Sequence, residues 1–213
     1  MKTKVHTIYK LKDKTRVPGA TTITGMLDKG NALIHWAWKL GCDGIDYRKF
    51  ADDKAAIGTL AHDMIVSHLT GEETDFSDYS KNQIDQAENS CLSYYEWEKG
   101  KEISVLFAEK PLVSEEYKYG GTADIVAVID GTLTLLDLKT GSAIYPEMAI
   151  QLAAYNQLLI ESAVFAQSHQ ILRIGRSEDE GFEVKQYGKN QMDAAWEIFE
   201  NLINIYYRRK ELK

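Results

Sequence analysis

Apolar residues recur every three or four positions in five segments of the chain, which is the spacing of an amphipathic helix. This pattern predicts helices over about residues 31–40, 52–69, 81–99, 146–160 and 191–209. The first three segments are followed by Gly41, Gly71 and Gly100, and glycine commonly follows the last turn of a helix. Pro146 suits the first turn of the fourth helix.

Segments rich in β-branched and apolar residues lie between these helices and predict strands. Two short ones, residues 5–11 and 16–22, precede the first helix; the others are residues 103–107, 122–129, 132–138, 170–174 and 182–186. The chain has no internal repeat and no Pro/Ser-rich linker. We therefore expect one α/β domain over residues 1–213, with a mainly helical part over 1–100 and a strand-rich part over 101–213.

Asp130-Gly131 joins two of these strands, and Asp-Gly between β-rich runs is a strong signal for a two-residue hairpin turn. Such a turn places Ile129 opposite Thr132 and, counting outward, Asp124 opposite Asp137. The two carboxylates are then expected on the same face, with Cβ atoms about 5 Å apart.

Two carboxylates at that separation repel each other by about 3 kcal/mol at an effective dielectric constant near 20, so a positive group is expected between them. Lys139 follows on the same face, and a divalent ion would serve the same purpose. Paired carboxylates suit Mg²⁺ or Mn²⁺, with the backbone carbonyl of Leu138 as a further ligand. The alternative is a plain surface salt bridge between these aspartates and Lys139.

Composition narrows the function classes. The chain has 213 residues, a net charge of −7, 44% hydrophobic residues and 2 cysteines. These values exclude a mainly disordered chain, a cysteine-ligated metal cluster and a surface that binds nucleic acid over its whole area. Basic residues gather in residues 2–16 and 208–210, either as local contacts or as solvated ends. With no apolar run long enough to cross a bilayer and no secretory signal, we expect a cytoplasmic protein without membrane contact.

Five motifs, in order along the chain, resemble the PD-(D/E)XK nuclease superfamily and its RecB-like, phage-type exonuclease branch. They are Gly58-Thr59-Leu60-Ala61-His62, the single residue Glu109, Gly120-Gly121-Thr122-Ala123-Asp124, Asp137-Leu138-Lys139-Thr140-Gly141 and Gln151-x-x-x-Tyr155. The resemblance implies a restriction-endonuclease-like core, that is, a central mixed β-sheet flanked by helices. The four cysteines of the CRISPR-associated nucleases of this branch are absent, which excludes that subfamily.

The resemblance also implies a role for each residue. His62, Asp124, Asp137 and the carbonyl of Leu138 would bind Mg²⁺ or Mn²⁺. Lys139 would position the attacking water or stabilise negative charge. Gln151 and Tyr155, one helical turn apart, would hold water, Lys139 or phosphate, and Glu109 would be a further carboxylate near the metal. For His62, a partly buried polar residue is the alternative, and Tyr155 could belong to the core.

The function expected from the resemblance is divalent-metal-dependent hydrolysis of DNA. We expect an exonuclease of phage or prophage type, acting on linear duplex or single-stranded ends in recombination or DNA processing, with a single-strand annealing protein as a candidate partner. The alternatives are a catalytically silent nucleic-acid-binding protein of the same fold and a structure-specific endonuclease. Trp36 and Trp38 could stack on bases or pack within the fold. Polarity, processivity, the number of metal ions and oligomeric state are left open by the sequence.

Overall fold

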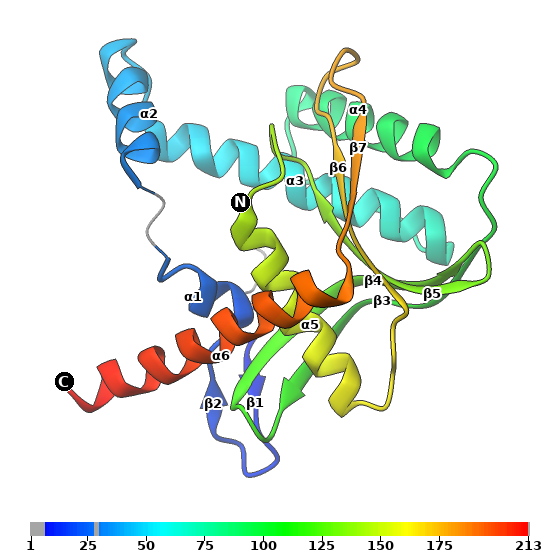
Figure 1. Ribbon diagram of the computed structural model, residues 1–213. Coiled ribbons are helices and arrows are strands. Elements are labelled where there is room, and N and C mark those ends of the chain that lie inside the picture. The colour runs from blue at the N-terminus through cyan, green and yellow to red at the C-terminus, as the bar shows by residue number, and fades with distance from the viewer. Residues whose placement is uncertain (1–6, 28–29, 213) are drawn as a thin grey trace.

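A computed structural model describes residues 7–27 and 30–212 of the chain. Its centre is one five-stranded sheet in the order β3-β4-β5-β6-β7 (Figure 1). The strands are β3 (Ile103–Ser114), β4 (Tyr119–Ile129), β5 (Thr132–Lys139), β6 (Ser168–Ile174) and β7 (Phe182–Gln186). The helices are α1 (Ala20–Thr24), α2 (Gly30–Cys42), α3 (Tyr47–Thr70), α4 (Lys81–Glu98), α5 (Pro146–Glu161) and α6 (Lys189–Glu211). Two short strands, β1 (Tyr9–Lys10) and β2 (Arg16–Val17), form a separate hairpin.

The sheet is mixed because of one connection. Strands β3, β4 and β5 run antiparallel, β5 and β6 run parallel, and β7 is antiparallel to β6. Parallel neighbours need a crossover, and α5 supplies it between β5 and β6. The predicted α/β fold with a central mixed sheet flanked by helices is thus confirmed.

Helices cover both faces of the sheet (Figure 1). Helices α3 and α4 enclose one core, in which Tyr94 and Trp97 pack with Leu136 and Leu138. Helices α5 and α6 enclose the other, which includes Leu135. Because β5 lies at the centre and is covered on both sides, its residues 134–138 are all buried.

The hairpin between β4 and β5 has the predicted geometry. Asp130 and Gly131 have φ values of 49° and 80°, the left-handed values that a two-residue turn of this type needs. The pairing follows the predicted register from Ile129 opposite Thr132 to Ile125 opposite Leu136. The predicted alignment of these two strands is therefore confirmed over this range.

The observed helix ends depend in part on local capping interactions. Helix α3 begins at Tyr47, earlier than predicted, because the Asp46 side chain accepts hydrogen bonds from the backbone amides of Arg48 and Lys49. It ends before Gly71 as predicted, and that glycine has a φ of 77°. Helix α2 continues through Gly41 to Cys42, so the predicted end at this glycine was wrong. None of the described helices is both long and apolar enough to cross a membrane.

Two strand predictions need correction. The predicted strand over residues 16–22 ends at Val17, since Ala20 and Ile23 of α1 turn into the core; Val5 of its expected partner lies outside the described residues. Strand β3 extends well beyond residue 107. It contains Pro111, which is tolerated because β3 is an edge strand of the sheet.

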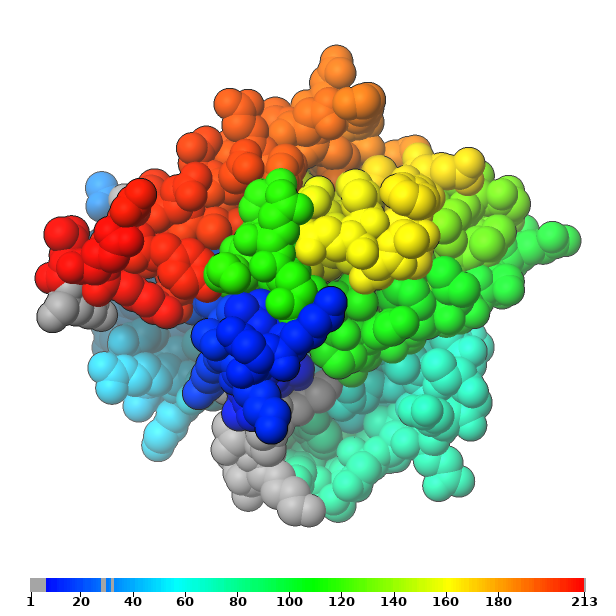
Figure 2. Space-filling model, turned by 90° about the horizontal axis from the view of Figure 1, so that it is seen from below, coloured from blue at the N-terminus to red at the C-terminus, as the bar shows by residue number. Residues whose placement is uncertain are grey.

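The glycines at the start of β4 make room for two tyrosines. A Cβ atom on Gly120 would lie 2.2 Å from Cγ of Tyr9, and one on Gly121 would lie 2.7 Å from Cε1 of Tyr155. The absence of side chains at Gly120 and Gly121 therefore lets the N-terminal hairpin and α5 approach β4, the strand that carries Asp124. In the view of Figure 2, the blue N-terminal segment lies against red α6 and the green strands.

Candidate active site

Asp124 lies one step beyond the paired part of the β4–β5 hairpin. The last backbone pair is Ile125 with Leu136, and at the next position the Asp124 side chain continues the connection: its Oδ2 accepts a hydrogen bond of 2.9 Å from the amide of Leu138. The carboxylate is thus held against β5, the strand that carries Asp137.

Asp137 is fully buried and forms an ion pair through Oδ2 with Nζ of Lys139. Its Oδ1 has no hydrogen-bond partner among the described residues. Burial raises the pKa of Asp137 to about 6; Lys139 opposes this rise, and the charge of Asp124 adds to it. Burial alone would lower the pKa of Lys139, but Asp137 and Asp124 together raise it. The pKa values of Asp137 and of Lys139 can both be raised, because one ammonium group interacts with two carboxylates.

The raised pKa of Asp137 predicts a pH-dependent stability of the metal-free protein. The folded state binds this proton more tightly than the unfolded state, whose carboxyl has the ordinary value of 3.8. The free energy of unfolding should therefore decrease by about 3 kcal/mol from this group as pH rises from about 4 to about 6, and stay level above that. Urea unfolding in EDTA measures it, with Asp137→Asn as the reference. Equal pH dependence of the two proteins in this window would contradict the prediction.

His62 reaches the carboxylates from α3. Its Nδ1 lies 3.8 Å from Oδ2 of Asp124, and both side chains are largely buried. The approach depends on Gly58, one turn earlier: a Cβ atom there would lie 2.8 Å from Oγ1 of Thr140, which directly follows Lys139. The structure therefore brings together the helix motif and the Asp137-Leu138-Lys139-Thr140-Gly141 motif, which lie far apart in the sequence.

Gln151 and Tyr155 lie on the same side of α5. The amide nitrogen Nε2 of Gln151 donates a hydrogen bond of 2.6 Å to the Tyr155 hydroxyl. Burial, followed by the charges of Asp124 and Asp137, raises the pKa of Tyr155 well above its ordinary value. The phenol therefore keeps its proton and can act as a donor near the carboxylates, while its ring belongs to the core.

Glu109 is brought alongside Asp124 by the register of β3 and β4. The pairs on either side are Ala108 with Ile125 and Lys110 with Ala123, so Glu109 stands opposite Asp124. Its φ of 44° is unusual for a residue other than glycine. Such backbone strain is often found at functional sites, and the role of Glu109 near a metal stays a prediction.

Sequence reasoning missed two residues next to these motifs. The hydroxyl of Tyr9 lies 2.9 Å from Oγ1 of Thr122, and Nη2 of Arg176 donates a hydrogen bond of 3.1 Å to Oγ1 of Thr140. No sequence signal identifies Tyr9. Arg176 could have been found, because it follows the end of β6, and parallel strands end at the same edge of a sheet.

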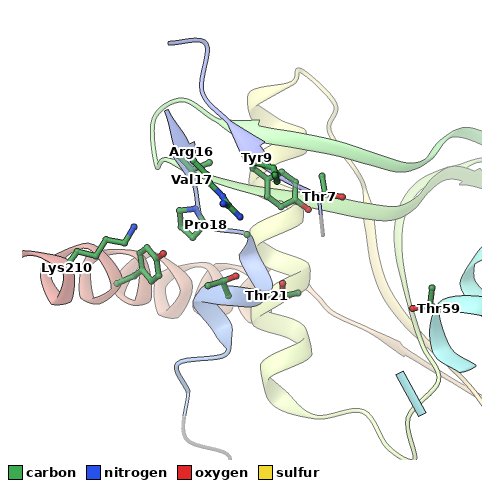
Figure 3. A pocket seen from close by; sticks show the side chains of 12 residues that line it. Thr7, Tyr9, Arg16, Val17, Pro18, Thr21, Thr59 and Lys210 are labelled. Carbon is green, nitrogen blue, oxygen red and sulfur yellow. The ribbon is translucent and has the colours of Figure 1, made fainter. Parts of the chain in front are cut away.

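Two cavities border the candidate site. The larger, about 900 Å³, lies between the N-terminal hairpin, α1, α6 and α3, and Figure 3 shows Tyr9, Arg16, Thr21, Thr59 and Lys210 around it. The smaller, about 520 Å³, is lined by residues of α2 and α3, among them Gly58, and by the segment that follows β5, Tyr145 and Arg176. Because Gly58 and Thr59 are adjacent, the cavities share the turn of α3 that precedes His62. None of the described residues that line these two cavities is acidic.

The residues present suit a divalent ion in part. The unpartnered Oδ1 of buried Asp137 and the carboxylate of Asp124 are oxygen donors of the kind that Mg²⁺ prefers. Within residues 7–27 and 30–212, no group of three or more His, Cys, Asp or Glu side chains is arranged to hold an ion unaided. An ion would therefore need backbone oxygen, as expected of Leu138, and water, which Mg²⁺ commonly retains.

Comparisons with known proteins include distant matches to solved structures. No protein-family model matches the sequence, and no curated protein matches it. A solved structure from Eubacterium rectale, provisionally described as an exonuclease, has a TM-score of 0.44 and 13% identity, covering 90% of this chain and 73% of that one. An alkaline exonuclease from Laribacter hongkongensis has a TM-score of 0.37 and 11% identity, covering 91% and 92%. Both likenesses are distant, so the chemistry of this chain rests on its own side chains.

Proposed function

We propose that the protein is a divalent-metal-dependent deoxyribonuclease. The observation that carries this proposal is the buried Asp137 carboxylate, paired with Lys139 and placed beside Asp124 at the end of a hairpin. A fold gains little from burying a carboxylate that keeps one oxygen unpartnered, so a role in binding or catalysis accounts for it better than a structural role does.

Each residue of the candidate site would have a separate role in hydrolysis. Asp124, Asp137 and the Leu138 carbonyl would hold Mg²⁺ or Mn²⁺, with His62 against Asp124. When bound, the ion supplies positive charge to the scissile phosphate and lowers the pKa of the attacking water. The Lys139 ammonium would stabilise the negative charge that develops as water adds to phosphorus and the P–O bond breaks.

The cavities support a polyanionic substrate. The chain carries a net charge of −7, yet the larger cavity is lined by Arg16 and Lys210 and the smaller by Lys54 and Arg176, and none of the lining residues within 7–27 and 30–212 is acidic. Cations gathered in a cavity favour phosphate binding, and the Arg176 guanidinium is also within electrostatic reach of Glu180 and Asp53. Within this activity we favour exonuclease action of phage or prophage type, in recombination and alongside an annealing protein, because of the order of the motifs in the sequence.

Incubation with linear and covalently closed DNA tests the proposal. The purified protein is compared in Mg²⁺, Mn²⁺ and EDTA, with Asp137→Ala as the inactive reference. Loss of linear DNA alone, only with metal, is the expected result. Cutting of closed circles as well would replace the exonuclease by an endonuclease, and binding without turnover in any metal would leave a nucleic-acid-binding protein.

A further inference from the structure

The smaller cavity lies directly against the segment that follows Lys139. Thr140 and Gly141 form part of its lining, and Gly58 of α3 forms another part. Its volume of about 520 Å³ is within the range of sites that hold small molecules. Any group bound there would therefore lie next to the proposed reaction centre.

Arg176 supplies a fixed cation in this cavity. Its backbone amide donates a hydrogen bond of 2.7 Å to Oε2 of Glu180, and its carbonyl accepts one of 3.2 Å from Nδ2 of Asn89. The guanidinium donates through Nη2 to Thr140, whereas the buried Nε has no hydrogen-bond partner among the described residues. A guanidinium has five N–H donors, so this one has capacity left for a phosphate.

The rest of the lining combines aromatic rings and a second cation. Trp36 of α2 and Phe50 of α3 are in edge contact, with ring centroids 6.0 Å apart. Nζ of Lys54 lies 5.5 Å from the centre of the Phe50 ring and donates a hydrogen bond to Gln86. Tyr145, at the N-terminus of α5, is partly exposed at the cavity. Aromatic rings beside cations are the combination that holds single-stranded nucleic acid.

We infer that this cavity binds a nucleotide unit next to the scissile phosphate, with its base against Trp36 and its phosphate on Arg176. The inference rests on the proposed function. It also assigns the two tryptophans of α2 different roles: Trp36 lines the cavity, whereas Trp38 is 63% exposed and is absent from the lining. Trp38 is therefore a matched control on the same helix.

Binding of a fluorescein-labelled oligothymidylate in EDTA, followed by anisotropy, tests the inference. Trp36→Ala should raise the Kd about tenfold or more, and Trp38→Ala should leave it nearly unchanged. Arg176→Gln should weaken binding and reduce the slope of log K against log salt by about 0.7, the effect of one lost phosphate contact. Arg176→Lys, which keeps the charge, should retain the slope. Circular dichroism verifies that each variant is folded.

The outcomes separate this inference from the proposed function. If the wild-type protein degrades DNA but Trp36→Ala and Arg176→Gln bind like wild type, the cavity has no role in binding and the inference alone fails. If the wild-type protein neither binds the oligonucleotide nor degrades DNA, both fail. If both folded variants, Trp36→Ala and Trp38→Ala, lose affinity for the oligonucleotide to the same extent, the specific assignment of the base contact to Trp36 is also overturned.

Discussion

Asp137→Asn is expected to reduce the rate of DNA hydrolysis by about 10³-fold. Asparagine has nearly the shape of aspartate but no charge, so the variant removes the buried negative oxygen that would bind the metal and leaves the packing of β5 in place. Single-turnover measurements with saturating protein and Mg²⁺ report the chemical step without the influence of product release.

Asp130→Asn is the matched control for this experiment. Asp130 lies at the turn of the same hairpin, where its side chain accepts a hydrogen bond from the amide of Glu102. Asparagine also tolerates the left-handed backbone found there. We expect the control to hydrolyse DNA at the wild-type rate. Activity of Asp137→Asn within tenfold of wild type would remove Asp137 from the mechanism.

Lys139→Gln is expected to bind DNA but to cut it about 10²-fold more slowly, because the ammonium would act on the charge that develops during the reaction. The same change leaves Asp137 buried without its cation, which should destabilise the metal-free protein by about 3 kcal/mol. The Kd of the oligonucleotide, the single-turnover rate and the free energy of unfolding in EDTA distinguish these effects.

A double variant separates the catalytic role of Lys139 from its structural role. Asp137→Asn combined with Lys139→Gln has no buried charge at this position, so its stability should exceed that of Lys139→Gln alone. Its activity should nevertheless stay as low as that of Asp137→Asn. A Lys139→Gln variant that cuts at the wild-type rate would show that the lysine only balances the buried carboxylate.

Local signals in the sequence predicted most of the fold. The Asp130-Gly131 turn determined the register as far as Ile125 and Leu136, because a two-residue loop admits only one alignment. Helical periodicity located the long helices, since each buries one face. The wrong predictions arose where packing or capping overrode a local preference. The threonines after Gly19 favour a strand, but α1 forms there and buries Ile23.

The candidate site was predictable only in part, for a physical reason. The two strands of the hairpin are joined by a two-residue turn, so spacing alone indicated Asp124 and Asp137, whereas Gln151 was indicated by the resemblance. The approach of α3 to Thr140 and of Tyr9 to Thr122 depends on packing between distant segments, which no periodicity encodes. Only the resemblance to a nuclease family singled out His62.

The central place of β5 determines when the site can form during synthesis. Its parallel partner β6 begins at Ser168, so a chain that ends before this residue leaves β5 as an edge strand and lacks Ile171 and Tyr187, which lie near Asp137, so that water has easier access to this carboxyl. The carboxyl would then regain an ordinary pKa, and its attraction to Lys139 would be screened. Nascent or prematurely terminated chains should therefore be inert toward DNA, and the complete sheet should be needed before any strand is cut.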